Sequence, residues 1–174
     1  LRTPLARLRL GVEMSGAPED EVTAMVSDID EMNRIIGQFL DYGRGEPQEP
    51  VQQVDLAALV REMTEPYRLR GVALDTELPD TLLAPARALP LRRAVANLLD
   101  NALRYGAPEG PLLVSVYPEG REVCIEVADR GPGIPEAEVE RLRQPFSRLE
   151  VARSNTKGAG LGLAIVERVM RSHQ

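Results

Sequence analysis

An aspartate followed by a glycine-rich turn is the first group of residues whose types and spacing suggest chemistry. Asp129, Gly131, Gly133 and Ile134 come directly after residues 123–128, whose alternating apolar pattern predicts a half-buried strand. The strand delivers Asp129 to its carboxyl end, where a carboxylate can accept a hydrogen bond from an exocyclic amine. The two glycines let the backbone approach a flat ring. We interpret this segment as one half of a nucleotide site.

A second glycine-rich turn lies further along the chain and leads into an apolar-periodic segment, which predicts a closing helix over residues 161–171. Backbone N–H groups in such a turn and at a helix N-terminus face an incoming anion. The turn contains Gly158, Gly160, Leu161 and Gly162. It is the predicted phosphate side of the same site.

Two asparagines on a third segment supply ligands for a metal. Asn97 and Asn101 are four residues apart, so they share one face of the helix predicted around residues 92–106. Amide oxygens suit a hard divalent cation that keeps most of its waters, as magnesium does when it accompanies phosphates. The apolar stripe that should hold this helix against the core contains Leu91, Val95, Leu98 and Ala102.

In this order and spacing, the segments resemble the N, G1, F and G2 boxes of the histidine kinase ATP-binding domain, with Pro145 and Phe146 as the F box. The resemblance implies an α+β fold, with an α/β sandwich of the GHKL (Bergerat) type, and ATP and Mg²⁺ as cofactors. Segments 93–97 and 104–106 look most like the osmosensing EnvZ type of sensor kinase.

The resemblance also implies roles for single residues. Asp129 would read the adenine amine, and the glycines and Ile134 after it would shape the pocket. Asn101 would hold magnesium, while Asn97 would support the metal or its water. Arg104 would meet phosphate oxygens, and Tyr105 would cover the adenine face.

Residues 134–157 are a long polar segment, which resembles the ATP lid of these kinases. Phe146 would anchor the lid. Taken singly, such residues have ordinary interpretations as turn glycines, solvated asparagines or surface charges; their joint order and spacing favour the nucleotide site. The residues of the lid and second turn implied in phosphate contact are Arg148, Arg153, Lys157, Gly158, Gly160, Leu161 and Gly162.

Composition limits the other classes of function. The 174 residues, 43% of them apolar, suffice for one ordinary domain or two small ones, and no run is apolar enough to span a bilayer. A net charge of −6 argues against nucleic acid as a partner. Cys124 is the single cysteine, and we interpret it as a small buried hydrophobic residue. Because His173 is also the single histidine, the sequence has too few cysteine and histidine ligands for a zinc site.

The opening residues have two interpretations. Thr3 and Pro4 fit an N-cap and a first helical position. Residues 1–5 also resemble the tail of a kinase H box, in which case the helix begins upstream, and this is the interpretation we favour. The phosphoacceptor histidine and its neighbouring acidic general base would then precede Leu1, and Thr3 would match the position that orients water for dephosphorylation. His173 is expected to be an exposed terminal residue rather than an acceptor.

Residues 1–44 predict a helical hairpin with a turn at 15–20, and its second helix carries a heptad seam. One hairpin cannot bury that seam alone, which favours a homodimeric four-helix bundle. Residues 45–54 are the predicted linker and first strand, and 55–174 the catalytic domain, with Asp55 as a helix N-cap. The family normally has two more strands after the last helix, so either these strands are lost, disordered or deleted or the sheet is smaller than usual. The seam residues are Val22, Met25, Ile29, Met32, Ile36 and Phe39.

The implied function is that of the cytoplasmic core of a two-component sensor kinase. The parent protein would lie in a bacterial inner membrane, and this part of it would make no membrane contact. Phosphate would pass from ATP to histidine, making the parent a phosphoprotein, and then to an aspartate of a receiver domain. Phosphatase activity toward that receiver is also implied. One alternative is an ATPase of the gyrase, Hsp90 and MutL superfamily, which would have glutamate at Asn97. The stronger alternative is a catalytically silent nucleotide-binding dimer or partner-docking fragment.

Overall fold

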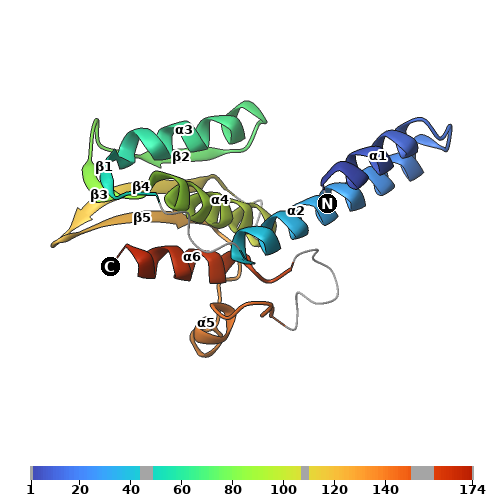
Figure 1. Ribbon diagram of the computed structural model, residues 1–174. Helices are drawn as coiled ribbons and strands as arrows, with labels where there is room; N and C mark the ends of the chain where they lie inside the picture. The colour runs from blue at the N-terminus through green and yellow to red at the C-terminus, as the bar shows by residue number, and fades with distance from the viewer. Residues whose placement is uncertain (1, 44–48, 107–109, 150–158, 174) are drawn as a thin grey trace.

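The computed structural model describes residues 2–43, 49–106, 110–149 and 159–173. A helical hairpin projects from a body in which helices pack on a mixed sheet (Figure 1). Among the described residues, the helices are all too short or too polar to cross a membrane. In chain order the elements are α1 (Arg2–Glu13), α2 (Glu19–Gly43), β1 (Gln52–Asp55), α3 (Leu56–Leu69), β2 (Leu74–Glu77), β3 (Leu83–Ala86), α4 (Ala88–Tyr105), β4 (Leu112–Glu119), β5 (Glu122–Ala128), α5 (Glu136–Leu142) and α6 (Gly162–Ser172).

The hairpin of α1 and α2 buries only part of its apolar surface. Leu5 and Ile29 are buried, and the Arg9 Nη1 and Asp30 Oδ1 atoms, 2.9 Å apart, join the two helices. Two further residues of the predicted seam, Met25 and Phe39, are 48% and 55% exposed. The hairpin therefore presents an apolar stripe that its own chain leaves open.

The strands form two sheets. β1 pairs antiparallel with β3, while the second sheet has the order β2-β4-β5, with β2 parallel and β5 antiparallel to β4. The mixed sheet confirms the predicted fold class, whereas the separate two-stranded sheet was not predicted. Pro85 lies inside β3, which is compatible with a strand that has a single neighbour.

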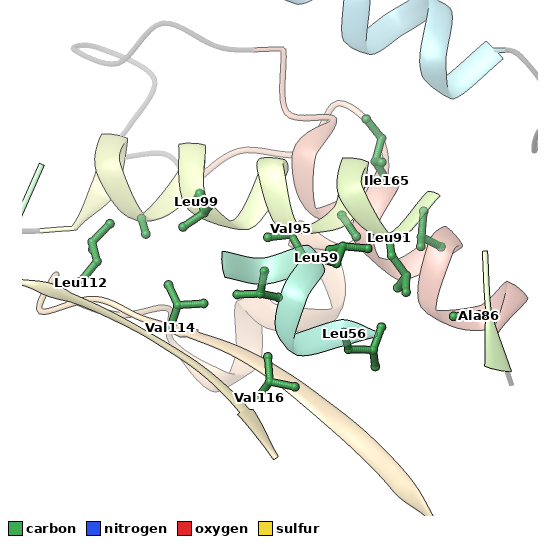
Figure 2. Packing of buried hydrophobic residues seen from close by; sticks show 14 of the residues in the cluster. Leu56, Leu59, Ala86, Leu91, Val95, Leu99, Leu112, Val114, Val116 and Ile165 are labelled. Atoms are coloured by element: carbon green, nitrogen blue, oxygen red, sulfur yellow. The ribbon is translucent and has the colours of Figure 1, made fainter. Parts of the chain in front are cut away.

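The core lies between the inward face of β4 and helices α3, α4 and α6 (Figure 2). Alternate residues of β4, including Val114 and Val116, point into it, as the period of a strand requires. In the expected stripe on α4, Leu91, Val95 and Ala102 are buried and Leu98 is half-buried; the fully buried Leu99 was not expected. Because α4 packs against both α3 and α6, its buried face is wider than a single stripe.

The surroundings of the Cys124 and His173 side chains differ from those predicted. Cys124 is partly exposed and its Sγ donates to Glu119 Oε2 at 3.1 Å, so it is not a buried hydrophobe. This hydrogen bond, followed by burial, raises the pKa of the Cys124 thiol. His173 is also only partly exposed, and both of its ring nitrogens have hydrogen-bonding partners.

Candidate nucleotide-binding site

The side chains of Asn97 and Asn101 converge on the start of α6. A Cβ placed on Gly162 would lie 3.3 Å from the Oδ1 atom of each asparagine. Asn97 Nδ2 donates to Arg93 O at 2.8 Å, which turns the amide nitrogen toward its own helix and leaves Oδ1 facing Gly162. The predicted metal-binding face and the second glycine turn are therefore brought together.

Asp129 lies where the end of β5 meets the end of α4. Its Oδ1 accepts a hydrogen bond from the Gly131 N–H at 2.7 Å, forming a tight turn. A Cβ on Gly106 would lie 2.9 Å from the Asp129 Cβ, and one on Gly131 would lie 2.7 Å from Tyr105 O. The side chains of Tyr105 and Ile134 are 41% and 46% exposed. The first glycine turn is thus seated against the asparagine helix.

The second glycine turn packs against the F box through backbone atoms. Gly160 has φ of 68°, and a Cβ there would lie 2.6 Å from Ser147 O and 2.9 Å from the Phe146 carbonyl carbon. Phe146 itself has φ of 62°, unusual for a residue with a side chain, and its side chain is 61% exposed. The Phe146 backbone, rather than its ring, makes this contact.

The predicted lid contains a helix that the sequence analysis missed. Residues 134–157 were expected to be a polar loop, but α5 forms within them. Pro135 followed by Glu136 and Glu138 is a helix-start signal that could have identified it, because acidic residues favour a helix N-terminus. Arg148 is partly buried and its carbonyl oxygen accepts from Arg141 Nη1 at 3.1 Å. Arg153, Lys157 and Gly158 lie outside the described residues.

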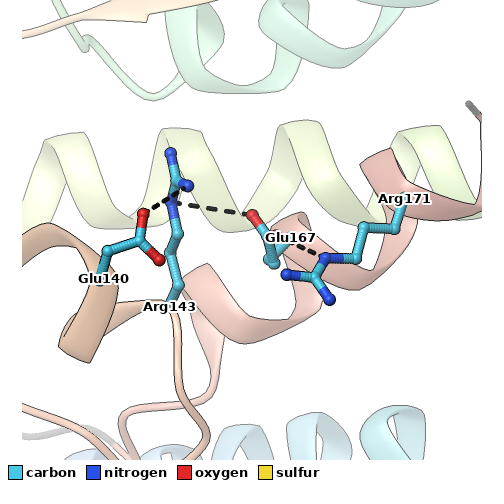
Figure 3. A network of polar contacts seen from close by, with 4 residues as sticks. All are labelled: Glu140, Arg143, Glu167 and Arg171. Atoms are coloured by element: carbon cyan, nitrogen blue, oxygen red, sulfur yellow. Dashed lines mark hydrogen bonds and ion pairs between the residues drawn. The ribbon is translucent and has the colours of Figure 1, made fainter.

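Ion pairs join the end of α5 to α6 (Figure 3). Arg143 lies 3.2 Å from Glu140 and 3.7 Å from Glu167, and Glu167 also pairs with Arg171 at 2.7 Å. Exposed pairs of this kind contribute little individually, and a shared carboxylate couples them. This network holds the described part of the lid beside the helix that begins at Gly162.

Arg104 contacts the hairpin. Its Nη2 lies 3.6 Å from Glu31 Oε2 of α2, and Arg34 also pairs with Glu31. The side chains of Arg104 and Glu31 are 23% and 15% exposed, so this pair is less screened than a surface pair. Sequence analysis did not predict the contact. Thr3 lies in α1, on the hairpin rather than among the glycine turns.

A second unpredicted contact joins α4 to α3. Tyr67 OH of α3 donates to Asp100 Oδ1 at 3.2 Å. Burial, and then the charge of Asp100, raises the pKa of Tyr67 to about 12, so the hydroxyl remains a donor at neutral pH. Asp100 immediately precedes Asn101, and the contact therefore fixes the helix next to one candidate ligand.

Comparison with known proteins places these segments in one family. Residues 86–174, which contain α4, both glycine turns and the lid, match the model of the histidine kinase-, DNA gyrase B-, and HSP90-like ATPases. The chain belongs to this ATPase family.

Relatives of the chain include named sensor kinases. It is 36% identical over 192 residues to the signal transduction histidine-protein kinase/phosphatase MprB of Mycobacterium sp. (strain KMS), covering 99% of this chain and 36% of that protein. The chain thus spans about a third of the length of this curated relative.

Solved structures of histidine kinases have the same fold. Full-length ShkA in complex with AMPPNP matches with a TM-score of 0.71 and 25% identity, over 98% of this chain and 38% of that one. The histidine kinase domain of the E. coli osmosensor EnvZ matches with a TM-score of 0.53 and 34% identity, over 74% of this chain and 79% of that one. The resemblance to sensor kinases read from the four boxes is confirmed.

Proposed function

We propose that this chain is the ATP-binding catalytic core of a two-component sensor histidine kinase, with residues 1–44 as the dimerisation hairpin, 45–54 as linker and 55–174 as the catalytic domain. The single observation that supports this most is the convergence of the Asn97 and Asn101 amide oxygens on the glycine at the start of α6. Helix starts favour phosphates, and amide oxygens suit the cation that accompanies them.

The residues present fit Mg²⁺ bound together with a nucleotide. The described part of the chain contains no group of three or more His, Cys, Asp and Glu side chains that could hold a metal by themselves. Asn101, supported by Asn97, would hold the ion through neutral oxygens, which suits a cation that shares its charge with phosphates. When bound, Mg²⁺ neutralises charge on the transferring phosphoryl group.

The other site residues bind and orient the nucleotide. Asp129, exposed at the end of β5, would accept from the adenine amine, and Tyr105 would cover the ring. Arg104 and Arg148 would meet phosphate oxygens, together with Arg153, Lys157 and Gly158. Catalysis would rest on positioning and on charge, as in other phosphoryl transfers.

The proposed partners are a second copy of the chain and a receiver domain. The open apolar stripe on α2, including Met25 and Phe39, supports dimerisation into a four-helix bundle. Phosphate would pass through a histidine to a receiver aspartate, and Thr3 would orient the water that later removes the phosphate from that aspartate. The parent protein would be a sensor in a bacterial inner membrane, with this part in the cytoplasm.

Magnesium-dependent ATP binding, measured by calorimetry, tests the site. We expect the parent chain to bind, and Asn101→Ala and Asp129→Asn to lose most of the binding. Asn33→Ala in the hairpin and Asp80→Asn between β2 and β3 are matched controls that should bind as the parent does. A parent chain that does not bind ATP would overturn the proposal.

The second candidate, a nucleotide-binding dimer without phosphotransfer, is favoured by one observation. The only histidine in the sequence is His173, which lies at the end of α6 and is hydrogen-bonded there. A complementation assay separates the two: the chain is mixed with a longer kinase chain whose ATP site is disabled but whose histidine is present. Labelled phosphate on that histidine supports the kinase; nucleotide binding without transfer supports the silent dimer.

A further inference from the structure

His173 bridges the end of α6 and the start of α4. Its Nδ1 lies 2.8 Å from Val169 O, and its Nε2 lies 3.0 Å from the Arg87 backbone nitrogen. A carbonyl oxygen can only accept and a backbone N–H can only donate, so Nδ1 carries the proton and Nε2 is the acceptor. The imidazole that makes both contacts is therefore neutral.

The bridge belongs to a polar junction that caps both helices. Arg87 is the N-cap residue of α4 but its side chain makes no cap to its own helix; instead its Nη1 donates to Ser172 O at 2.7 Å. The Glu49 carboxylate accepts from the Leu89 N–H at 2.9 Å. Backbone groups that helix ends leave unpaired are thus satisfied across the junction.

The two helices are held at both ends by different means. At the start of α6, Gly162 faces Asn97 and Asn101. At the end of α6, His173 Nε2 accepts a hydrogen bond from the Arg87 N–H. The helices share the apolar core between these points. Apolar contacts are non-directional and tolerate sliding, whereas a hydrogen bond weakens steeply when its geometry changes. The junction therefore sets the position of α6 along α4.

We infer that His173 is a positioning residue for nucleotide binding: its neutral imidazole holds α6 against the start of α4, so that Gly162 stays opposite the two asparagines. The inference rests on the proposed nucleotide site and adds the residue that sets the distance between Gly162 and the two asparagines. In the described part of the chain, the hydrogen-bonding partners of His173 are Arg87, Ser172 and Val169, and none of these is assigned to the nucleotide.

Protonation would oppose this arrangement. A proton on Nε2 would turn the acceptor into a second donor facing the Arg87 N–H. The Arg87 guanidinium lies at the same junction, where the Glu49 carboxylate is the counter-charge; on α6 itself the charged groups are Glu167, Arg168 and Arg171. The C-terminus of α6 favours a cation and the N-terminus of α4 disfavours it, so these two effects oppose each other. The lost hydrogen bond then decides the sign, so a charged imidazole would weaken the bridge between α6 and α4.

Calorimetry of Mg-ATP binding to the 174-residue chain, well below its Tm, tests the positioning role. His173→Leu keeps apolar bulk but loses both hydrogen bonds, and we expect roughly fivefold weaker binding, the value of about one hydrogen bond. His173→Gln keeps an acceptor near the place of Nε2 and should bind within about twofold of the parent.

Two variants separate positioning from stability. Thr64→Ala removes the Thr64 Oγ1 to Arg61 O bond on α3 alone, and Glu49→Ala removes the Leu89 cap on α4 alone. Each should lower Tm and leave Mg-ATP affinity unchanged, because neither breaks the bridge made by His173.

Nitrogen NMR adds a direct readout, since the sequence has a single histidine. We expect the Nδ1–H tautomer in the parent chain at pH 8. Equal Mg-ATP affinities of the parent and His173→Leu, or an Nε2–H tautomer, would each overturn the inference alone. A parent chain that binds no nucleotide would overturn the proposed function and the inference with it.

Discussion

Glu31 of the hairpin and Arg104 of the asparagine helix form an ion pair of 3.6 Å, and both side chains are largely shielded from solvent. Arg104 is also the residue proposed to meet nucleotide phosphates. One guanidinium therefore has two acidic partners to choose between, a carboxylate of the hairpin and a phosphate of the nucleotide.

We predict that Glu31→Gln raises Mg-ATP affinity about threefold to fivefold, because the competing pair contributes about 1 kcal/mol. Adenosine, which has no phosphate, should bind the parent and the variant equally. Glu13→Gln, which removes the exposed Arg9–Glu13 pair of the hairpin, is the control and should change neither affinity. Calorimetry measures all of these; a rise in adenosine affinity would contradict competition at the phosphate.

We predict that Gly162→Ala weakens Mg-ATP binding about tenfold, a loss of about 1.4 kcal/mol. The new Cβ would lie 3.3 Å from both asparagine oxygens, so each must move by a few tenths of an ångström. Folding should suffer little, since alanine favours a helix by up to about 1 kcal/mol over glycine. Gly11→Ala in α1, where a Cβ meets open space, should leave binding unchanged. Retained affinity in Gly162→Ala would argue against the asparagines as ligands.

We predict that Phe146→Gly is more stable than Phe146→Ala by about 1 kcal/mol in urea unfolding. Both changes delete a ring that is 61% exposed, but only glycine adopts φ of 62° without steric cost. Because both variants lose the ring, its contribution to the free energy of unfolding cancels in the comparison. Equal stability would mean that the F-box backbone relaxes when its side chain is removed.

The N-cap of α3 gives a pH-dependent prediction. Asp55 Oδ1 accepts from the N–H groups of Leu82, Ala57 and Ala58, and the Leu82 bond contributes most to lowering the pKa of this carboxyl. Because its folded pKa lies below its unfolded one, the stabilisation is complete above the ordinary value of about 3.9 and disappears as pH falls through the folded pKa. Asp55→Ala should lower Tm by about 4 °C at pH 7, with the difference shrinking below about pH 4. Calorimetric melting across this pH range measures the Tm difference between the parent and Asp55→Ala. A difference that does not change with pH would contradict the role of the Asp55 charge.

Local patterns in the sequence predicted most of the elements. The cap at Asp55, the strand ending near Ala128, and the shared face of Asn97 and Asn101 follow from periods and caps within a few residues. The order of the glycine turns then predicted the family, because backbone approach to a nucleotide requires glycine at fixed points.

The features that sequence reasoning missed depend on residues far apart in the chain. The pair of Glu31 with Arg104, and the bridge from His173 to Arg87, join residues whose patterns give no sign of each other. The separate β1–β3 sheet was missed for the same reason, since strand pairing is a tertiary choice. Only α5 had a local signal, at Pro135, that the polar composition of the lid obscured.

The hydrogen bond between Cys124 and Glu119 has a consequence for redox chemistry. A thiol reacts with oxidants and alkylating reagents as the thiolate, and the neighbouring carboxylates keep Cys124 protonated at neutral pH. The chain's single sulfhydryl is therefore a slow nucleophile. A cysteine introduced at an exposed position, such as Met14 at the hairpin turn, would take up a maleimide dye first and allow site-specific labelling without removing Cys124.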